Sequence, residues 1–170
     1  MRAIRRAGIG IVVGAALCAL AGSARADESI KVLRSVGYSE STFVRPEVKS
    51  ECRMTEQLPQ FIQEYAHENG IDVELVDSLP ATGRVLELQI TDTIETGNAW
   101  TGRQKGLVIQ GRLLQDGAVV GSFRARRMTM GGAFGGYKGT CSFFGRCAKT
   151  LGHDVAEWLR SPGTDASLGS

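Results

Sequence analysis

The residues best suited to chemistry gather in the last third of the chain. A glycine-rich segment, GGAFGGYKGT, spans residues 131–140 and contains Lys138. A phosphate-binding loop needs glycine, four further residues and then glycine, lysine and serine or threonine. Lys138 stands between a tyrosine and a glycine, so that spacing is absent. We therefore expect a mobile connection or close backbone packing, with a binding loop contacting through Phe134 and Tyr137 as the alternative.

The cysteines offer a disulfide or a metal site. Cys52, Cys141 and Cys147 lie beyond the N-terminal segment, so at least one is unpaired within a monomer. The first expectation is the local bridge Cys141–Cys147, worth about 2 kcal/mol of loop entropy; a bridge from Cys52 to either partner, worth nearer 5 kcal/mol, stays open. Together with His153 these cysteines could bind zinc, but the local pair is too widely spaced for a common structural site. We predict no metal.

No catalytic motif stands out in the sequence. His67 and His153 are the only histidines, and no Gly-x-Ser-x-Gly elbow or Cys-x-x-Cys dithiol is present. A hydrolase or ligand-binding site built from scattered carboxylates and a histidine stays open as the alternative, because chain spacing says nothing about distances in the fold. The first expectation is a protein that is not an enzyme and has no cofactor.

Charge is unevenly distributed along the chain. Residues 27–100 hold 6 basic and 14 acidic residues, whereas residues 101–170 hold 10 basic and 4 acidic ones. The net negative charge after residue 26 argues against a uniformly basic nucleic-acid binder. Either the two halves interleave and neutralise each other, or the basic half forms a surface that meets an anionic partner such as a protein, a lipid headgroup or a cell-wall polymer.

The N-terminus has the pattern of an export signal. Three arginines precede an uncharged apolar stretch, and Ala24-Arg25-Ala26 fits a signal-peptidase site. We expect residues 1–26 to be cleaved after Ala26 and the rest to be periplasmic, without a membrane span. Cys18 could mark a lipoprotein, but Leu17 stands where a small residue is expected. A single domain is predicted over residues 27–162, followed by a flexible tail, 163–170.

The segments that carry these residues alternate between strand and helix patterns. Apolar and polar residues alternate, which predicts strands, in residues 29–38, 71–75 and 85–91. Apolar residues recur every three or four positions, which predicts amphipathic helices, in residues 58–66 and 144–159. The order predicts an α+β fold: a four- to five-stranded, mostly antiparallel sheet with two helices on one face, a two-layer sandwich.

A β-hairpin is predicted over residues 105–128. A two-residue Asp116-Gly117 turn would mix apolar and charged residues on each face, so we predict a three-residue loop that also includes Gln115. The apolar side then holds Leu107, Ile109, Gly111, Leu113, Val119, Gly121, Phe123 and Ala125. The polar side holds Val108, Gln110, Arg112, Ser122, Arg124 and Arg126.

The segment from Gly131 to Trp158 resembles small exported proteins of Gram-negative bacteria that carry a Lys-Gly-Thr-Cys…Gly-Arg-Cys signature. That group implies no activity. The order of elements is also similar to the α+β modules of periplasmic lipoproteins involved in envelope assembly, a likeness of architecture without shared motif residues.

The function expected from these observations is a periplasmic binding or envelope-assembly module. Its partner would be a protein or an anionic component of the envelope, and not nucleic acid. The candidate contact residues share positive charge or aromatic character and are Arg124, Arg126, Phe134, Tyr137, Lys138, Arg146 and Lys149.

Overall fold

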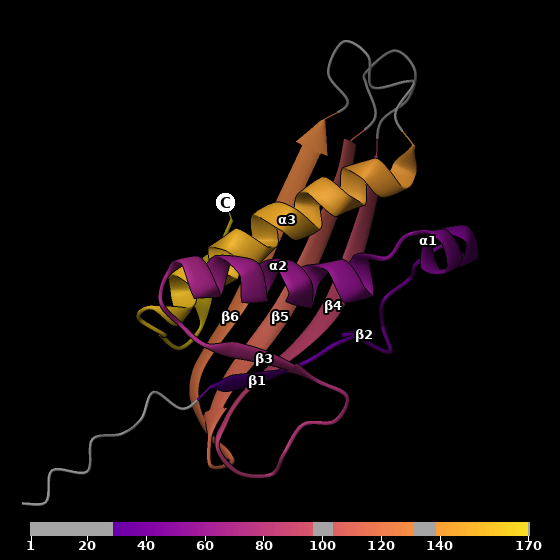
Figure 1. Ribbon diagram of the computed structural model, residues 1–170. Helices are drawn as coiled ribbons and strands as arrows, with labels where there is room; N and C mark the ends of the chain where they lie inside the picture. Colours follow the sequence, from indigo (N-terminus) through magenta and orange to yellow (C-terminus); the bar gives the residue numbers. More distant parts are fainter. Residues whose placement is uncertain (1–28, 97–103, 131–138, 170) are drawn as a thin grey trace, which may run out of the picture.

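The computed structural model describes residues 29–96, 104–130 and 139–169. In chain order the elements are β1 (Ile30–Leu33), β2 (Gly37–Tyr38), α1 (Pro46–Glu51), α2 (Met54–Glu68), β3 (Val73–Val76), β4 (Arg84–Thr96), β5 (Gln104–Gln115), β6 (Ala118–Met130), α3 (Thr140–Leu159) and β7 (Ala166–Leu168) (Figure 1). The predicted signal peptide lies outside the described residues.

The strands form one mixed sheet of seven strands in the order β3-β1-β4-β5-β6-β7, with β2 also paired to β4. The long strands β4, β5 and β6 are antiparallel. The pairs β1–β3, β1–β4, β2–β4 and β6–β7 are parallel. The α+β class is confirmed, but the predicted sheet was too small and too uniformly antiparallel. β2 and β7 are too short to show an alternating pattern in the sequence.

The two long helices, α2 and α3, cover one face of the sheet (Figure 1). Their buried residues follow the predicted periodicity, as Leu58 and Ile62 of α2 and Leu151 and Val155 of α3 show. Gly152 allows the helices to approach closely, because a Cβ atom there would lie 2.5 Å from the Cβ of Phe61. The opposite face of β4, β5 and β6 carries polar and charged side chains together with the buried Val85 and Val108. We call it the open face.

Two further segments differ from the prediction. Residues 46–51, expected in a connection, form the short helix α1. The C-terminal segment 163–170, expected to be a flexible tail, contributes β7, which pairs with β6 at Phe123 to Ala125. Among the described residues no helix is long and apolar enough to cross a membrane.

The β5–β6 hairpin has the predicted sidedness but a different turn. Gln115 pairs with Ala118, so the turn has two residues, and Asp116 and Gly117 both have positive φ, 51° and 82°. This conformation fits the right-handed twist of a hairpin. The register then shifts between Leu113 and Leu114, because a bulge inserts one residue and restores the apolar side. The prediction of a three-residue loop was therefore wrong. The prediction that Val119 lies on the apolar side was also wrong, because this residue is 49% exposed.

Candidate functional site

Arg124 and Arg126 point from β6 onto the open face. Their neighbours Phe123 and Ala125 point the other way, into the core, where Phe123 meets the Trp158 ring of α3 edge to face at 4.8 Å. Both arginines are exposed. The predicted alternation along this strand is thereby confirmed at these positions.

The side chains of the two arginines differ from those of most other arginines in having no partner among the residues that the structure describes. Ion pairs are formed by Arg34, Arg45, Arg53, Arg112, Arg127 and Arg160. Neither the Arg124 side chain nor the Arg126 side chain forms an ion pair or hydrogen bond with another residue in the described part of the chain. Two exposed guanidinium groups on alternate residues of one strand can each make up to five hydrogen bonds to an anion.

A hollow of about 590 Å³ lies beside them on the open face. Its polar lining comes from facing positions of β4 and β5, where Glu87 pairs with Arg112 and Gln89 lies opposite Gln110. Gln110 is in turn opposite Arg124 across β5 and β6. The hollow and the free arginines are therefore parts of one polar surface. Sequence reasoning placed Gln110 and Arg112 on this side but did not select them as contact residues.

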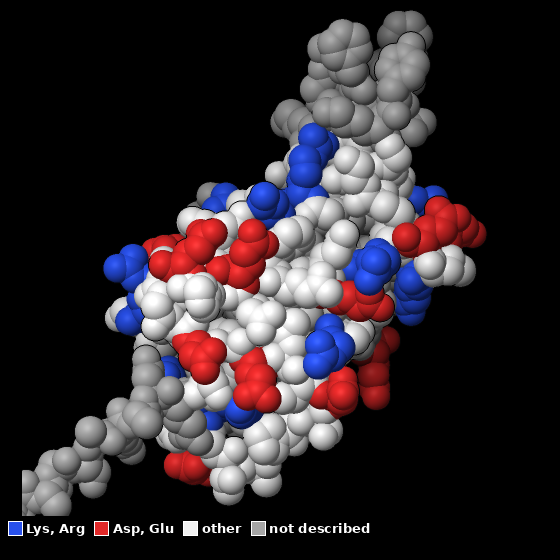
Figure 2. Space-filling model, in the orientation of Figure 1, with Lys and Arg blue, Asp and Glu red and all other residues white. Residues whose placement is uncertain are grey.

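Arg146 and Lys149 lie on the other layer of the protein. Both are exposed on α3, and the Arg146 guanidinium lies over the Phe143 ring, 4.8 Å from its centroid. Figure 2 shows the helix side, where basic and acidic side chains are interspersed over the surface. The predicted contact residues are thus split between two surfaces. Phe134, Tyr137 and Lys138 lie outside the described residues.

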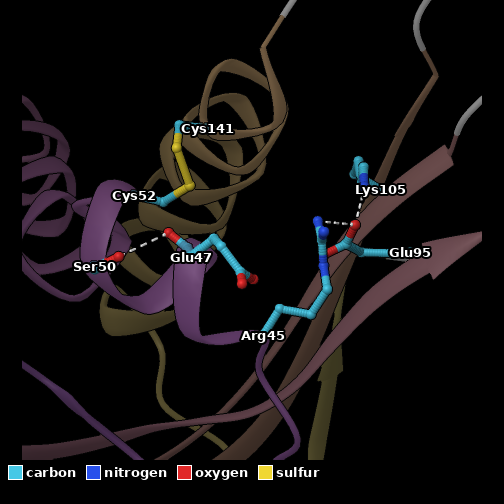
Figure 3. The surroundings of a disulfide bond; sticks show 7 residues. All are labelled: Arg45, Glu47, Ser50, Cys52, Glu95, Lys105 and Cys141. Atoms are coloured by element: carbon cyan, nitrogen blue, oxygen red, sulfur yellow. Dashed lines mark hydrogen bonds and ion pairs between the residues drawn. A yellow bond between two sulfur atoms is a disulfide. The ribbon is translucent and has the colours of Figure 1, made fainter.

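The disulfide joins Cys52 to Cys141, with 4.9 Å between their Cα atoms (Figure 3). The prediction of a local bridge Cys141–Cys147 was wrong. The alternative of a bridge from Cys52, which the sequence left open, is confirmed. Both residues of the local pair belong to α3, and six residues of helix span about 9 Å along the axis, too far for a disulfide. The bridge instead ties the start of α3 to the residue that follows α1.

Cys147 is a free thiol in the core, 2% exposed. Burial raises its pKa to about 11, outweighing a backbone hydrogen bond and the charge of Arg146. A buried thiol that stays protonated at neutral pH is a poor nucleophile. With Cys52 and Cys141 bridged, the zinc arrangement is lost, and no group of three or more potential ligands in the described ranges is placed to hold a metal ion.

An ion cluster lies near the disulfide, at the end of β4 and the start of β5 (Figure 3). Glu95 accepts hydrogen bonds from Arg45, at 2.7 Å to Nη2, and from Lys105. Burial raises the pKa of Glu95, but hydrogen bonds and charge from Lys105 and Arg45 outweigh it and the net pKa is lowered. Because Lys105 is 8% exposed, the cluster satisfies a buried cation and anchors the strand ends.

The histidines do not form an enclosed site. His67 lines a surface hollow of about 440 Å³ with Glu64, Glu68 and Asp72, and all four side chains are exposed. His153 is exposed and meets the Tyr65 ring edge on, 5.2 Å between centroids. A hydrolase or ligand-binding protein would favour a pocket that excludes water around converging groups, so these histidines lend it little support.

The fold is shared with solved proteins of Gram-negative bacteria. No family model and no curated protein matches the chain. A minor lipoprotein from Acinetobacter baumannii matches with a TM-score of 0.50 and 11% identity, over 78% of this chain and 90% of that chain. A Xanthomonas campestris protein described by the family model DUF330 matches with a TM-score of 0.56 and 12% identity, over 78% and 83%. The looser architectural resemblance is confirmed at the level of fold, while the Lys-Gly-Thr-Cys resemblance stays a prediction.

Proposed function

We propose that this protein is a non-enzymatic binding module of the bacterial envelope that holds an anionic partner on its open face. The observation that carries the proposal is the pair Arg124 and Arg126, exposed on the face opposite α2 and α3 and without ion-pair partners among the described residues. Unpaired guanidinium groups recognise carboxylates or phosphates by bidentate hydrogen bonds and steer anions by long-range attraction.

The surroundings of the arginines support a binding surface more than a reactive centre. The polar part of the adjoining hollow's lining consists of two glutamines and the ion pair of Glu87 with Arg112, groups that can hydrogen-bond a partner. The α3 stripe of Arg146 and Lys149 is a second basic surface, but it lies on the other layer. We assign the partner to the open face because Arg146 already has a ring contact.

The envelope location rests on the predicted export signal and on the fold shared with a lipoprotein. We propose that the chain is cleaved after Ala26 and works in the periplasm. Mass spectrometry of the protein purified from a periplasmic extract tests this. A chain beginning at Asp27 is expected, and an intact leader in the purified protein would contradict the proposal.

In-cell crosslinking with mass spectrometry tests the binding surface. The variant Arg124→Gln/Arg126→Gln should lose the crosslinked partner while its melting temperature stays close to that of the wild type. The matched control, Arg53→Gln/Arg160→Gln, removes the same charge from two exposed ion pairs on the helix side and should retain the partner. Loss of the partner only in Arg146→Gln/Lys149→Gln would move the surface to α3 and overturn the assignment.

A further inference from the structure

The strand β3 lies at the edge of the sheet, and its outer side is paired with no other strand in the described ranges. Its one strand partner there is β1. The Ile30 N–H donates to the Asp72 carbonyl and the Arg34 N–H to the Val76 carbonyl, both at 2.8 Å. Backbone groups alternate along a parallel strand, so those of the odd-numbered residues point away from β1. Val73 and Leu75 therefore present a carbonyl and an N–H outward.

The outward carbonyls are held only by side chains. The Gln63 amide donates to the Val73 carbonyl at 2.8 Å, and the Arg34 guanidinium donates to the Leu75 carbonyl at 3.0 Å. Within the described residues nothing accepts from the outward N–H groups of Val73 and Leu75. Side chains can rotate away, so this edge offers both the donors and the acceptors that an added strand needs.

Two hollows beside α2 lie at the two ends of β3, and we call them, together with the strand edge between them, the groove. Two hollows of about 440 and 410 Å³ share Gln60; one reaches the start of β3 at Val73 and the other its end at Val76. The 4 residues of β3 span about 13 Å at the rise of a strand. The groove therefore has the length of the edge strand and is flanked by a helix, as an extended segment requires.

The charges of the groove indicate what would occupy it. At the end near Val73 the exposed carboxylates of Glu64, Glu68 and Asp72 have no cation partner in the described part of the chain. Figure 2 shows acidic side chains over this half of the helix layer. At the other end the charges are balanced, by Arg34 with Asp77 and by Arg53 with Glu56. The unbalanced end favours basic side chains.

We propose that an extended segment of a partner protein, carrying lysine or arginine, adds to β3 as a strand in the groove beside α2. Main-chain hydrogen bonds to Val73 and Leu75 supply the pairing, and the three carboxylates select the basic side chains. This surface is on the helix side of the sheet and does not depend on Arg124 or Arg126, so the proposal goes beyond the open-face function.

Amide hydrogen exchange with synthetic peptides tests the pairing. The probe is the acetylated hexapeptide Thr-Lys-Val-Lys-Val-Thr, and the matched control has glutamate in place of lysine. In the free protein the Leu75 amide should exchange rapidly; with the lysine peptide bound its exchange should slow by at least about tenfold. Binding without slowing, prior protection of this amide, or no binding at about 1 mM peptide would overturn the proposal.

Two variants separate strand addition from simple charge attraction. Leu75→Pro removes the outward donor without touching the bonds to β1, and proline is tolerated at such edge positions; it should abolish peptide binding. Glu64→Gln/Glu68→Gln keeps the backbone intact and should weaken binding about tenfold, which keeps the test valid if the proline variant does not fold. Arg124→Gln/Arg126→Gln should bind the peptide like the wild type. Equal binding by Leu75→Pro in its folded form would contradict strand addition.

Discussion

Neighbouring arginines of β6 on the two faces of the central sheet differ in whether their side chains form an ion pair. Arg127 points toward α3, where its guanidinium donates to both carboxylate oxygens of Asp154 at 2.7 and 2.8 Å. The hydrogen bonds to Asp154 raise the pKa of Arg127 despite partial burial. Arg126, one residue earlier, points to the open face and has no such partner.

Along this one strand, we infer that the paired arginine contributes to stability and that the unpaired arginines contribute to binding. Arg127, which is partly buried against α3, is paired with Asp154 because burial makes an unpaired charge costly. On the open face, hydration makes a free charge tolerable, so its presence needs no structural role. We therefore expect substitutions on the helix side to change the free energy of unfolding, and those on the open face to change binding.

The largest effect should come from the disulfide in the helix layer. Cys52 and Cys141 are 89 residues apart, and closing so long a loop restricts the unfolded chain by about 4–5 kcal/mol in the loop-entropy estimate. Cys52→Ser/Cys141→Ser should lose much of this in denaturant titration. Cys147→Ala, which keeps the bridge, should lose far less; equal losses would show that the bridge adds little.

The core beneath the helices should respond almost as strongly. Phe144 is fully buried between α3 and the sheet, so Phe144→Ala should cost about 3–5 kcal/mol through lost apolar contact and the cavity left behind. The control on the open face is Gln110→Ala, at an exposed position, which should change the free energy of unfolding by less than about 0.5 kcal/mol. Similar losses in the free energy of unfolding at both sites would show that the two faces do not differ in their contribution to stability.

The ion cluster at the strand ends should show a pH signature. The pKa of Glu95 is lowered by Lys105 and Arg45, so its charged form stabilises the fold above the unfolded-state pKa of about 4.3, and this contribution is lost as pH falls through the folded-state pKa. Glu95→Gln should cost about 1–3 kcal/mol at pH 7, because it leaves Lys105 without its anion.

Urea titrations of both proteins across pH provide the measurement. The difference in the free energy of unfolding between the wild type and Glu95→Gln should be full near neutral pH. It should narrow as pH falls below the unfolded-state pKa of about 4.3 and through the lower folded-state pKa, where the wild-type carboxyl becomes protonated too. A constant gap from pH 3 to pH 7 would mean that Glu95 contributes through packing and not through its charge.

Local patterns in the sequence predicted the helix layer and the sidedness of the hairpin. The three- and four-residue spacing of Leu58 and Ile62 reflects burial against one face, and the alternation through Arg124 and Arg126 reflects the pleat of a strand. Both are properties of a few consecutive residues. The position of the arginines on the face opposite the helices was therefore predictable, but the lack of side-chain partners for them among the described residues was not.

Features that depend on contacts between residues far apart in the chain could not be predicted from the sequence. The bridge from Cys52 is set by how α1 and α3 meet, and β7 exists only because the chain returns beside β6. The alternation of apolar and polar residues could not distinguish a two-residue turn with a bulge near Val120 from a three-residue loop. Both arrangements place nearly the same residues on each face of the hairpin. The groove beside β3 likewise arises from packing of α2 against an edge strand.

The smallest effect on stability is expected where the proposed function lies. Arg124→Ala/Arg126→Ala should change the free energy of unfolding by less than about 0.5 kcal/mol, because neither side chain has a charged partner to lose among the described residues. Arg127→Ala, the adjacent residue on the other face, removes a half-buried bidentate pair and should cost about 1–3 kcal/mol. Urea titration of the two variants side by side measures the difference.

The contrast between neighbours makes this test independent of any partner. Both variants shorten arginine side chains on β6 and keep the strand, so intrinsic strand preference contributes similarly to each. If the Arg124 and Arg126 variant were the more destabilised, these arginines would have a structural role and the case for a binding surface would fail. If it is as stable as the wild type, two exposed charges that the fold does not need are free to serve an anionic partner.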